Sequence, residues 1–155
     1  MTPCPSAPLP HVGGQRWKRP ESVLVVVYTA ADEVLVMRRC QPLNFWQSVT
    51  GSLHWEETDP LDAARRELYE ETGLSGVEIT ACGVVNRFLI LPAWRDRYPP
   101  EAVENVEQVF RVGLPRCRPV TLNPAEHDDY EWLPRKRAAA RVSSWTNRNA
   151  ILSLP

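Results

Sequence analysis

The alternation of apolar and polar positions changes its period along the chain, and this change predicts an α/β fold. Residues 22–29 form a continuous β-branched run, which is typical of a strand that is covered on both faces. A turn at residues 30–32 separates this run from residues 33–39, which predict a second strand. A further short strand is expected at residues 47–50, just before Gly51.

The next segment has a helical period instead. Thr58 or Asp59 can cap the start of a helix, and Pro60 is favoured in its first turn. Gly73 is a typical helix terminator. The apolar side of the predicted helix consists of Ala63, Ala64 and Leu68.

The second half of the chain continues the alternation of strands and helices. Residues 77–92 predict one or two strands with a break at Gly83. The remaining predicted elements are strands at 106–114 and 129–133 and closing helices at 138–142 and 146–154. Strands with interspersed helices predict an α/β sandwich built on a mixed sheet, in one domain that spans residues 18–155.

The overall charge argues against binding of the whole protein to a nucleic acid polymer or an anionic membrane. The chain has 155 residues, with 18 Lys and Arg against 19 Asp and Glu, so its formal net charge is -1. Such a balance gives no overall attraction to a nucleic acid polymer or an anionic membrane, so phosphate binding must depend on local cations. Residues 1–17 are rich in Pro and are expected to form a disordered tail.

The location of the protein is predicted from what the sequence lacks. The N-terminal segment does not have the charged start and apolar stretch of a signal peptide. No segment has the length of a membrane span. The four cysteines are widely spaced and are expected to be free thiols rather than disulfide or zinc ligands. Together these features predict a cytoplasmic protein.

The predicted helix carries three carboxylates on one face. Glu67, Glu70 and Glu71 stand at i, i+3 and i+4, where neighbouring side chains meet and like charges repel. Near a helix C-terminus they also oppose the macrodipole. A divalent cation with a preference for oxygen ligands, Mg²⁺ or Mn²⁺, would remove this penalty, and Arg66 is placed to orient a carboxylate. The alternative is an ordinary solvated helix face.

The whole segment 51–74 resembles the Nudix box, G-x5-E-x7-R-E-U-x-E-E-x-G-U, in which U is apolar. Its second half, residues 66–74, matches at every defined position. In the first half, Gly51 and Glu57 occupy the family's positions, but one extra residue lies within residues 58–62. The resemblance implies a Nudix-type α-β-α sandwich and hydrolysis of a phosphoanhydride bond in a small organic triphosphate.

Segments outside the box extend the resemblance from residue 18 to residue 151. They are similar to a bacterial subgroup of the family, the dihydroneopterin triphosphate pyrophosphohydrolases, which release pyrophosphate and leave the monophosphate during folate biosynthesis. The segments that carry this similarity are residues 18–20, 45–52, 97–98, 126–127 and 144–148.

The resemblance also implies roles for individual residues. Glu67, Glu71 and Glu126 would be Mg²⁺ ligands, and Glu70 would be a further ligand or would orient water. Four residues fall at positions where the subgroup contacts substrate, and the segment 88–91, beginning at Phe88, corresponds to a lining of the substrate pocket. These four are Lys18, Arg39, Thr50 and Ser144. Lys and Arg suit phosphate oxygens, and Arg can bind two at once.

Several of these residues also have simpler interpretations. Glu126 is equally consistent with an acid in a surface loop, and the apolar residues 88–91 are equally suited to the core. Trp46 and Trp145 can stack on a flat heterocycle or simply pack. His54 and His127 are assigned no catalytic role.

Three alternative functions follow from the same sequence. A purine nucleotide shares the fused ring and the triphosphate of a dihydropterin, so a housecleaning nucleoside triphosphate pyrophosphatase is one alternative. A Nudix-fold binding module without catalysis is another, although the complete set of Arg66, Glu67, Glu70 and Glu71 argues against it. The third is a structural protein with an acidic helix and no ligand. The sequence does not determine the oligomeric state or the number of metal ions.

Overall fold

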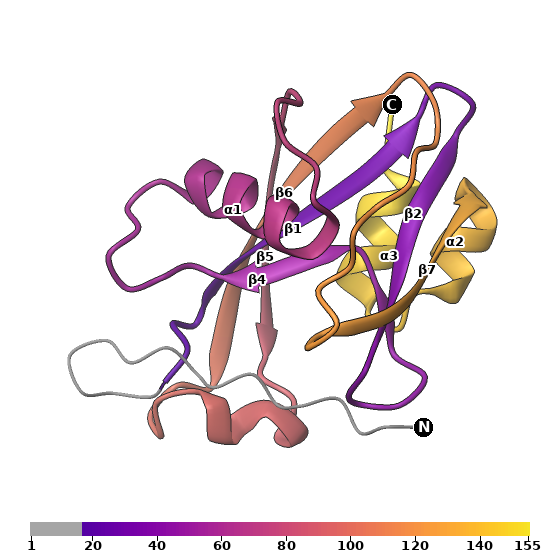
Figure 1. The fold of residues 1–155 in the computed structure, drawn as a ribbon. Helices are drawn as coiled ribbons and strands as arrows, with labels where there is room; N and C mark the ends of the chain where they lie inside the picture. The colour runs from indigo at the N-terminus through magenta and orange to yellow at the C-terminus, as the bar shows by residue number, and fades with distance from the viewer. Residues whose placement is uncertain (1–16) are drawn as a thin grey trace.

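The computed structural model describes residues 17–155, and seven strands within this range form one mixed sheet (Figure 1). The main strand order is β3-β2-β1-β6-β5, with β4 paired to β1 and β7 paired to β2. The strands are β1 (Glu21–Thr29), β2 (Glu33–Arg39), β3 (Trp46–Gln47), β4 (Val49–Ser52), β5 (Thr80–Leu89), β6 (Glu104–Leu114) and β7 (His127–Pro134). The helices are α1 (Pro60–Thr72), α2 (Arg135–Arg141), α3 (Trp145–Leu152) and the 3-10 helix η1 (Pro92–Arg97).

Strand β1 lies at the centre of the sheet. It pairs in parallel with β6 along its whole length and antiparallel with β2 and β4. Its side chains alternate between two cores, and residues 23–27 are all at most 1% exposed. Val23, Val25 and Val27 belong to one core, whereas Leu24 and Val26 belong to the other. This two-sided burial explains the unbroken β-branched run in the sequence.

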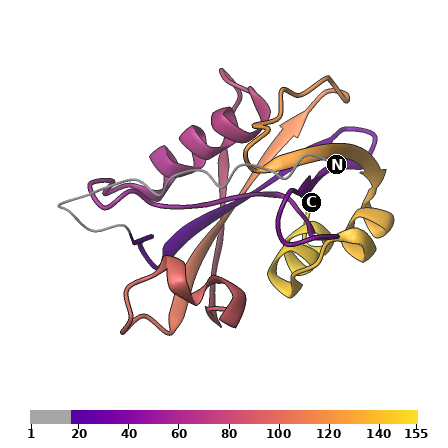
Figure 2. The ribbon, with the colours of Figure 1, turned by 60° about the horizontal axis from the view of Figure 1, so that its bottom comes forward.

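The helices cover both faces of the sheet. The apolar side of α1, formed by Ala63, Ala64 and Leu68, packs into the core that contains Val23 and Val25. Ala138, Ala139 and Ile151 of α2 and α3 pack into the core that contains Leu24 and Val26. Both views place α1 on one side of the sheet and the pair α2–α3 on the other (Figures 1 and 2). The predicted α-β-α sandwich on a mixed sheet is therefore confirmed.

Helix α1 begins and ends at residues suited to helix termini. The Asp59 side chain accepts a hydrogen bond from the Leu61 backbone N–H at 3.0 Å, which confirms it as the N-cap. Gly73 adopts a left-handed conformation with φ 75° and donates its N–H to the Tyr69 carbonyl. The extra residue before the helix therefore leaves its carboxylates in register.

One predicted strand is divided in the structure, and the segment predicted as one or two strands forms one. The single strand expected at residues 47–50 is divided at Ser48 into β3 and β4, because the chain passes there from pairing with β2 to pairing with β1. The long apolar segment 77–92 contains one strand, β5, whose register with β6 shifts between Ala81 and Val85 around Gly83 (φ 71°). The 3-10 helix η1 was not predicted.

Other predictions concern the tail, the membrane and the cysteines. The tail predicted at residues 1–17 lies, up to residue 16, outside the described residues. Within residues 17–155 no helix is long and apolar enough to cross a membrane, and the cytoplasmic location stays a prediction. Cys82 and Cys117 are free thiols as expected. The expectation is wrong for Cys40, which is disulfide-bonded and whose wide spacing in the sequence gave no signal of pairing.

The termination of α1 gives a test of the fold. Alanine at Gly73 or Gly76 would place a Cβ on a left-handed backbone, which costs about 1 kcal/mol. At Gly73 the Cβ would also lie 3.3 Å from Thr121, whereas at Gly76 it would meet no atom within 4 Å. We expect urea denaturation to show a larger loss of unfolding free energy for Gly73→Ala than for Gly76→Ala. Equal losses would contradict tight packing at the end of α1.

Candidate active site

The guanidinium group of Arg66 organises the inner face of α1. It donates to both carboxylate oxygens of Glu57, at 2.8 and 3.2 Å, and to the Ser52 carbonyl at 3.0 Å. It also donates to Glu67 at 2.8 Å and to Glu70 at 3.2 Å. A planar group with five donors suits this shared role, which Lys could not perform. The loop before the helix is thereby tied to β4 and to the helix carboxylates.

Glu57 keeps a defined role despite the extra residue in the preceding loop. Besides its two bonds from Arg66, its carboxylate accepts the His54 backbone N–H at 2.6 Å. Partial burial would raise the pKa of Glu57, but the hydrogen bonds from Arg66 and His54 outweigh this effect and lower it. Glu57 therefore remains charged and holds Arg66 in place.

Glu67 and Glu71 are buried side by side where α1 meets β4. Glu71 is completely buried, and its Oε2 accepts the Thr50 backbone N–H at 3.0 Å. Burial, followed by the nearby charges of Glu67 and Glu126, raises the pKa of Glu71 well above its usual range. Burial likewise raises the pKa of Glu67 to about 7, against the opposing effect of Arg66. A nearby cation would stabilise the ionised forms of two adjacent buried acids of this kind.

The loop before β7 brings a third carboxylate to these acids, and the first residue of β7 brings an imidazole. Glu126 is fixed by its carbonyl, which accepts the Cys40 backbone N–H at 2.8 Å. Ligand atoms of Glu71, Glu126 and His127 all lie within 4.8 Å of one another. Within residues 17–155, Glu71 Oε1 and His127 Nδ1 have no hydrogen-bond partner although both are buried, and they are 3.8 Å apart. An unpaired carboxylate oxygen in an acidic cluster fits a divalent cation.

The remaining acid of the predicted set lies further out. The Glu70 side chain is 48% exposed and pairs with Arg66 at 3.2 Å. It lines the same pocket as Glu67.

Gly51 leaves room for the Glu67 side chain. A Cβ at this position of β4 would overlap the Glu67 carboxylate, so a larger residue would displace the acid. The glycine that opens the Nudix box is therefore required here by a close approach of strand and helix.

Three cations converge near the acids. Lys18 precedes β1, Arg39 ends β2 and Arg97 ends η1, and the Lys18 backbone N–H donates to the Arg97 carbonyl at 2.6 Å. Burial, and then the neighbouring positive charges, lower the pKa values of both Lys18 and Arg39. Cations that repel one another in a partly buried site are stabilised by an anion such as phosphate.

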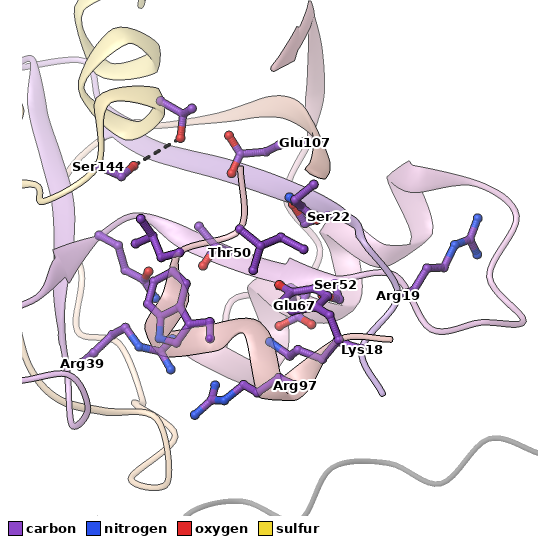
Figure 3. A pocket seen from close by; sticks show the side chains of 18 of the residues that line it. Lys18, Arg19, Ser22, Arg39, Thr50, Ser52, Glu67, Arg97, Glu107 and Ser144 are labelled. Atoms are coloured by element: carbon purple, nitrogen blue, oxygen red, sulfur yellow. Dashed lines mark hydrogen bonds between the residues drawn. The ribbon is translucent and has the colours of Figure 1, made fainter. Parts of the chain in front are cut away.

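One pocket of about 1060 Å³ joins these groups (Figure 3). Nine of the ten predicted site residues line it, and only Glu71 lies outside the lining, behind Glu67 and Thr50. The nine are Lys18, Arg39, Thr50, Arg66, Glu67, Glu70, Phe88, Glu126 and Ser144. In the close-up, Glu67 and the three cations lie on one side of Thr50, and Ser144 lies on the other.

Aromatic side chains form part of the pocket wall. Phe45 and Trp94 meet edge to face, with ring centroids 5.4 Å apart, and the Arg39 guanidinium lies 5.8 Å from the Trp94 ring. Trp145, 46% exposed, also lines the pocket. Trp46 packs instead against the core under α2 and α3, with Arg141 4.8 Å from its ring. Of the two predicted stacking candidates, only Trp145 faces the pocket.

The segment 88–91 is more exposed than a core segment would be. Phe88 is half-buried, Leu89 and Leu91 are 73% and 49% exposed, and only Ile90 belongs to the buried hydrophobic residues. All four line the pocket.

Some residues of the site had no sequence signal strong enough to single them out. Trp94 belongs to η1, which the sequence does not predict, and the sequence indicates no catalytic role for His127. Its burial and its Gln47 contact, with the two Nε2 atoms 3.0 Å apart, were not visible in the sequence. Burial, and then the charge of Arg39, lower the pKa of His127 to about 4, so the ring is neutral at pH 7.

The chain is similar to several known proteins. Dihydroneopterin triphosphate diphosphatase from Escherichia coli (strain K12) is 40% identical over 140 residues, which cover 87% of this chain and 91% of that protein. The protein of the same name from Haemophilus influenzae is 34% identical over 141 residues, or 88% and 87% of the two chains. The solved structure of the E. coli dihydroneopterin triphosphate pyrophosphohydrolase superposes with a TM-score of 0.81 at 39% identity, covering 87% of this chain and 94% of that one. The NUDIX domain family matches residues 18–153, and the chain belongs to this family.

Proposed function

We propose that the protein hydrolyses dihydroneopterin triphosphate to dihydroneopterin monophosphate and pyrophosphate, a reaction of folate biosynthesis. The observation that carries this proposal is the single pocket that joins a carboxylate cluster, three cations and aromatic walls. The relatives named dihydroneopterin triphosphate diphosphatase, which match most of the chain, support the choice of substrate.

Mg²⁺, or Mn²⁺ in its place, fits the carboxylates of Glu67, Glu71 and Glu126, with Glu70 at the outer edge. When bound, the ion supplies a Lewis acid that polarises phosphoryl oxygens and lowers the pKa of water. Arg66 holds Glu67 and Glu70 by hydrogen bonds, and the Thr50 N–H holds Glu71. These bonds fix the acids before substrate arrives, so little reorganisation is needed during the reaction.

The substrate contacts follow from the same placement. Lys18 and Arg39, with Arg97 beside them, bind the oxygens of the triphosphate and offset its negative charge. Thr50 lies at the middle of the pocket between the acidic cluster and Ser144 (Figure 3). Phe88 and Ser144 line the region that remains for the ring and its side chain. Residues 18–155 act in this proposal as one catalytic domain.

A nucleoside triphosphate pyrophosphatase is the nearest alternative. A purine nucleotide presents the same triphosphate and a fused ring of similar size, and the pocket volume of about 1060 Å³ admits either. A binding module without catalysis is disfavoured because Arg66 and the carboxylates keep their mutual hydrogen bonds.

Loss of one buried charge tests the acidic cluster. In Glu71→Gln the side chain keeps its size but loses the charge that faces Glu67 and Glu126. We expect Mg²⁺-dependent pyrophosphate release to fall by about a hundredfold or more, while the thermal stability without metal is retained because repulsion is relieved. The exposed Glu78→Gln is the matched control. Near-normal turnover of Glu71→Gln would exclude Glu71 as a ligand.

The raised pKa of Glu67 predicts the direction of pH dependence. Since the pKa is about 7 in the folded protein and near 4.5 when unfolded, the folded state binds more protons between these values. The contribution of Glu67 to stability is therefore full below pH 4.5 and is lost as the pH rises to about 7. His127, whose pKa is lowered to about 4, acts in the opposite direction. The effect of Glu67 is therefore measured as the difference in stability between the wild type and Glu67→Gln at each pH.

We expect melting temperatures of the metal-free proteins to show that Glu67→Gln gains stability relative to the wild type as the pH rises from 4.5 to 7.5. Saturating Mg²⁺ should stabilise the wild type more at pH 7.5 than at pH 5, because the ion competes with protons for the carboxylates. A Mg²⁺ effect that does not depend on pH would contradict the buried-acid description.

Substrate choice is tested by pyrophosphate release, with Mg²⁺ and with chelator, from dihydroneopterin triphosphate and a panel of nucleoside triphosphates. We expect kcat/KM to be highest for dihydroneopterin triphosphate. A higher kcat/KM for a nucleoside triphosphate would support pyrophosphate hydrolysis but contradict dihydroneopterin triphosphate as the preferred substrate. No metal-dependent release from any of them would favour the binding module.

A further inference from the structure

A group of polar side chains interrupts the apolar face of the sheet beside the pocket. Along β6, Asn105, Glu107 and Val109 are buried at alternate positions and therefore point to the same face. Val109 belongs to the core under α2 and α3, whereas Asn105 and Glu107 continue this row towards the pocket and line it. On β1, Ser22 lies opposite Glu107 and Leu24 lies opposite Val109. The side chains therefore change from apolar to polar at the same register position on both strands.

Asn105 is buried, and its side-chain amide is incompletely paired within the described residues. Its side-chain amide donates to Ser22 Oγ at 2.7 Å, and the residue is 3% exposed. Its Oδ1 has no hydrogen-bond partner within residues 17–155. A buried amide oxygen without a donor is costly in a folded protein, and an arriving N–H group would satisfy it.

Glu107 is a buried carboxylate without a cation partner in the described part of the chain. It is 4% exposed, and its hydrogen bonds come from the neutral side chains of Asn86, at 3.3 Å, and Thr146. Burial raises the pKa of Glu107, and these two hydrogen bonds only partly offset the effect. A carboxylate is acceptor-only when ionised, so it too favours an additional N–H donor.

These acceptors lie at the end of the pocket opposite the phosphate-binding cations. In Figure 3, Glu107, Ser22 and Ser144 lie on one side of Thr50, and Lys18, Arg39 and Arg97 lie on the other. The N-terminal turn of α3 closes this end, where Thr146 bonds to Glu107 and Ser144 lies 3.2 Å from Thr146. A ligand with its triphosphate on the cations would therefore place its ring towards β6.

We infer that Asn105 and Glu107 are specificity-determining residues that accept hydrogen bonds from the amino group and adjacent ring N–H of a 2-amino-4-oxo heterocycle. This inference deepens the proposed function and rests on it for the orientation of the substrate. Dihydropterins and guanine share a 2-amino-4-oxopyrimidine edge, whose oxo group is numbered 6 in guanine, and this edge presents neighbouring N–H donors. Two buried acceptors on one face of β6 complement that edge, whereas adenine lacks this pair of donors.

A purely structural role for these residues is less consistent with their surroundings. A polar group that serves packing alone is normally satisfied by neighbouring protein groups, as Ser22 satisfies the amide nitrogen of Asn105. The Asn105 oxygen is not satisfied in this way, and Glu107 adds a negative charge where a neutral glutamine would bury more easily.

The test compares GTP with ITP, which differ only in the 2-amino group, alongside dihydroneopterin triphosphate. Dissociation constants are measured in EDTA, without turnover, and kcat and KM with Mg²⁺. We expect the wild type to prefer GTP to ITP by about tenfold or more, since buried groups left unpaired penalise the analogue. In Glu107→Gln this ratio should approach one. KM for dihydroneopterin triphosphate should rise at least about tenfold, with kcat within about twofold.

Glu104→Gln is the matched control, because Glu104 is exposed on the same strand and pairs only with Arg87 among the described residues. Asn105→Ala provides a second variant should Glu107→Gln fail to fold, and it should also reduce the GTP preference. Equal losses for GTP and ITP, or a wild type that does not distinguish them, would overturn the inference. A wild type that prefers GTP over both ITP and dihydroneopterin triphosphate would retain the acceptor pair and reject only the proposed substrate.

Discussion

The burial of like charges between α1 and β4 is the constraint on which the site depends. Glu67 and Glu71 are both removed from water, next to each other and to Glu126, and each of these facts raises the free energy of the ionised state. The surrounding structure offsets part of this cost. Arg66 supplies the positive charge, and the Thr50 N–H supplies a hydrogen bond. The part of the cost that is not offset favours binding of a cation. Gly51 leaves the space that the Glu67 carboxylate occupies.

The pocket has two parts that suit different chemical groups of a ligand. Its cations come from three separate places, the residues before β1, the end of β2 and the end of η1, and the fold brings them to one pocket. On the other side of Thr50, the lining changes to neutral or acceptor groups from β6 and the start of α3. A ligand with an anionic end and a ring with N–H donors matches both parts. The parallel pairing of β1 with β6 places Ser22 opposite Glu107 in the second part.

The sequence by itself determined the elements that depend on local chemistry. The β-branched run of β1 predicted two-sided burial, because a continuous apolar run leaves the strand no polar face to turn towards water. Asp59 and Gly73 predicted the limits of α1, since a side-chain acceptor and a left-handed backbone are local requirements. The spacing of the glutamates placed three acids on one helix face. The resemblance to the Nudix family then named nine of the residues that line the pocket, although none of their roles follows from spacing alone.

Only the tertiary structure decided which residues face one another across long sequence separations. Cys40 is disulfide-bonded without a spacing signal, and the division of residues 47–50 into two strands depends on partners in β1 and β2. His127, Asn105 and Glu107 look like ordinary polar residues in the sequence. All three are buried. Within residues 17–155, Asn105 and His127 each have an unpaired side-chain atom and Glu107 has no cation partner, and these properties depend on neighbours contributed by other strands and by α3. Periodicity reports the environment of a side chain along its own element, whereas hydrogen-bond satisfaction is a property of the assembled fold.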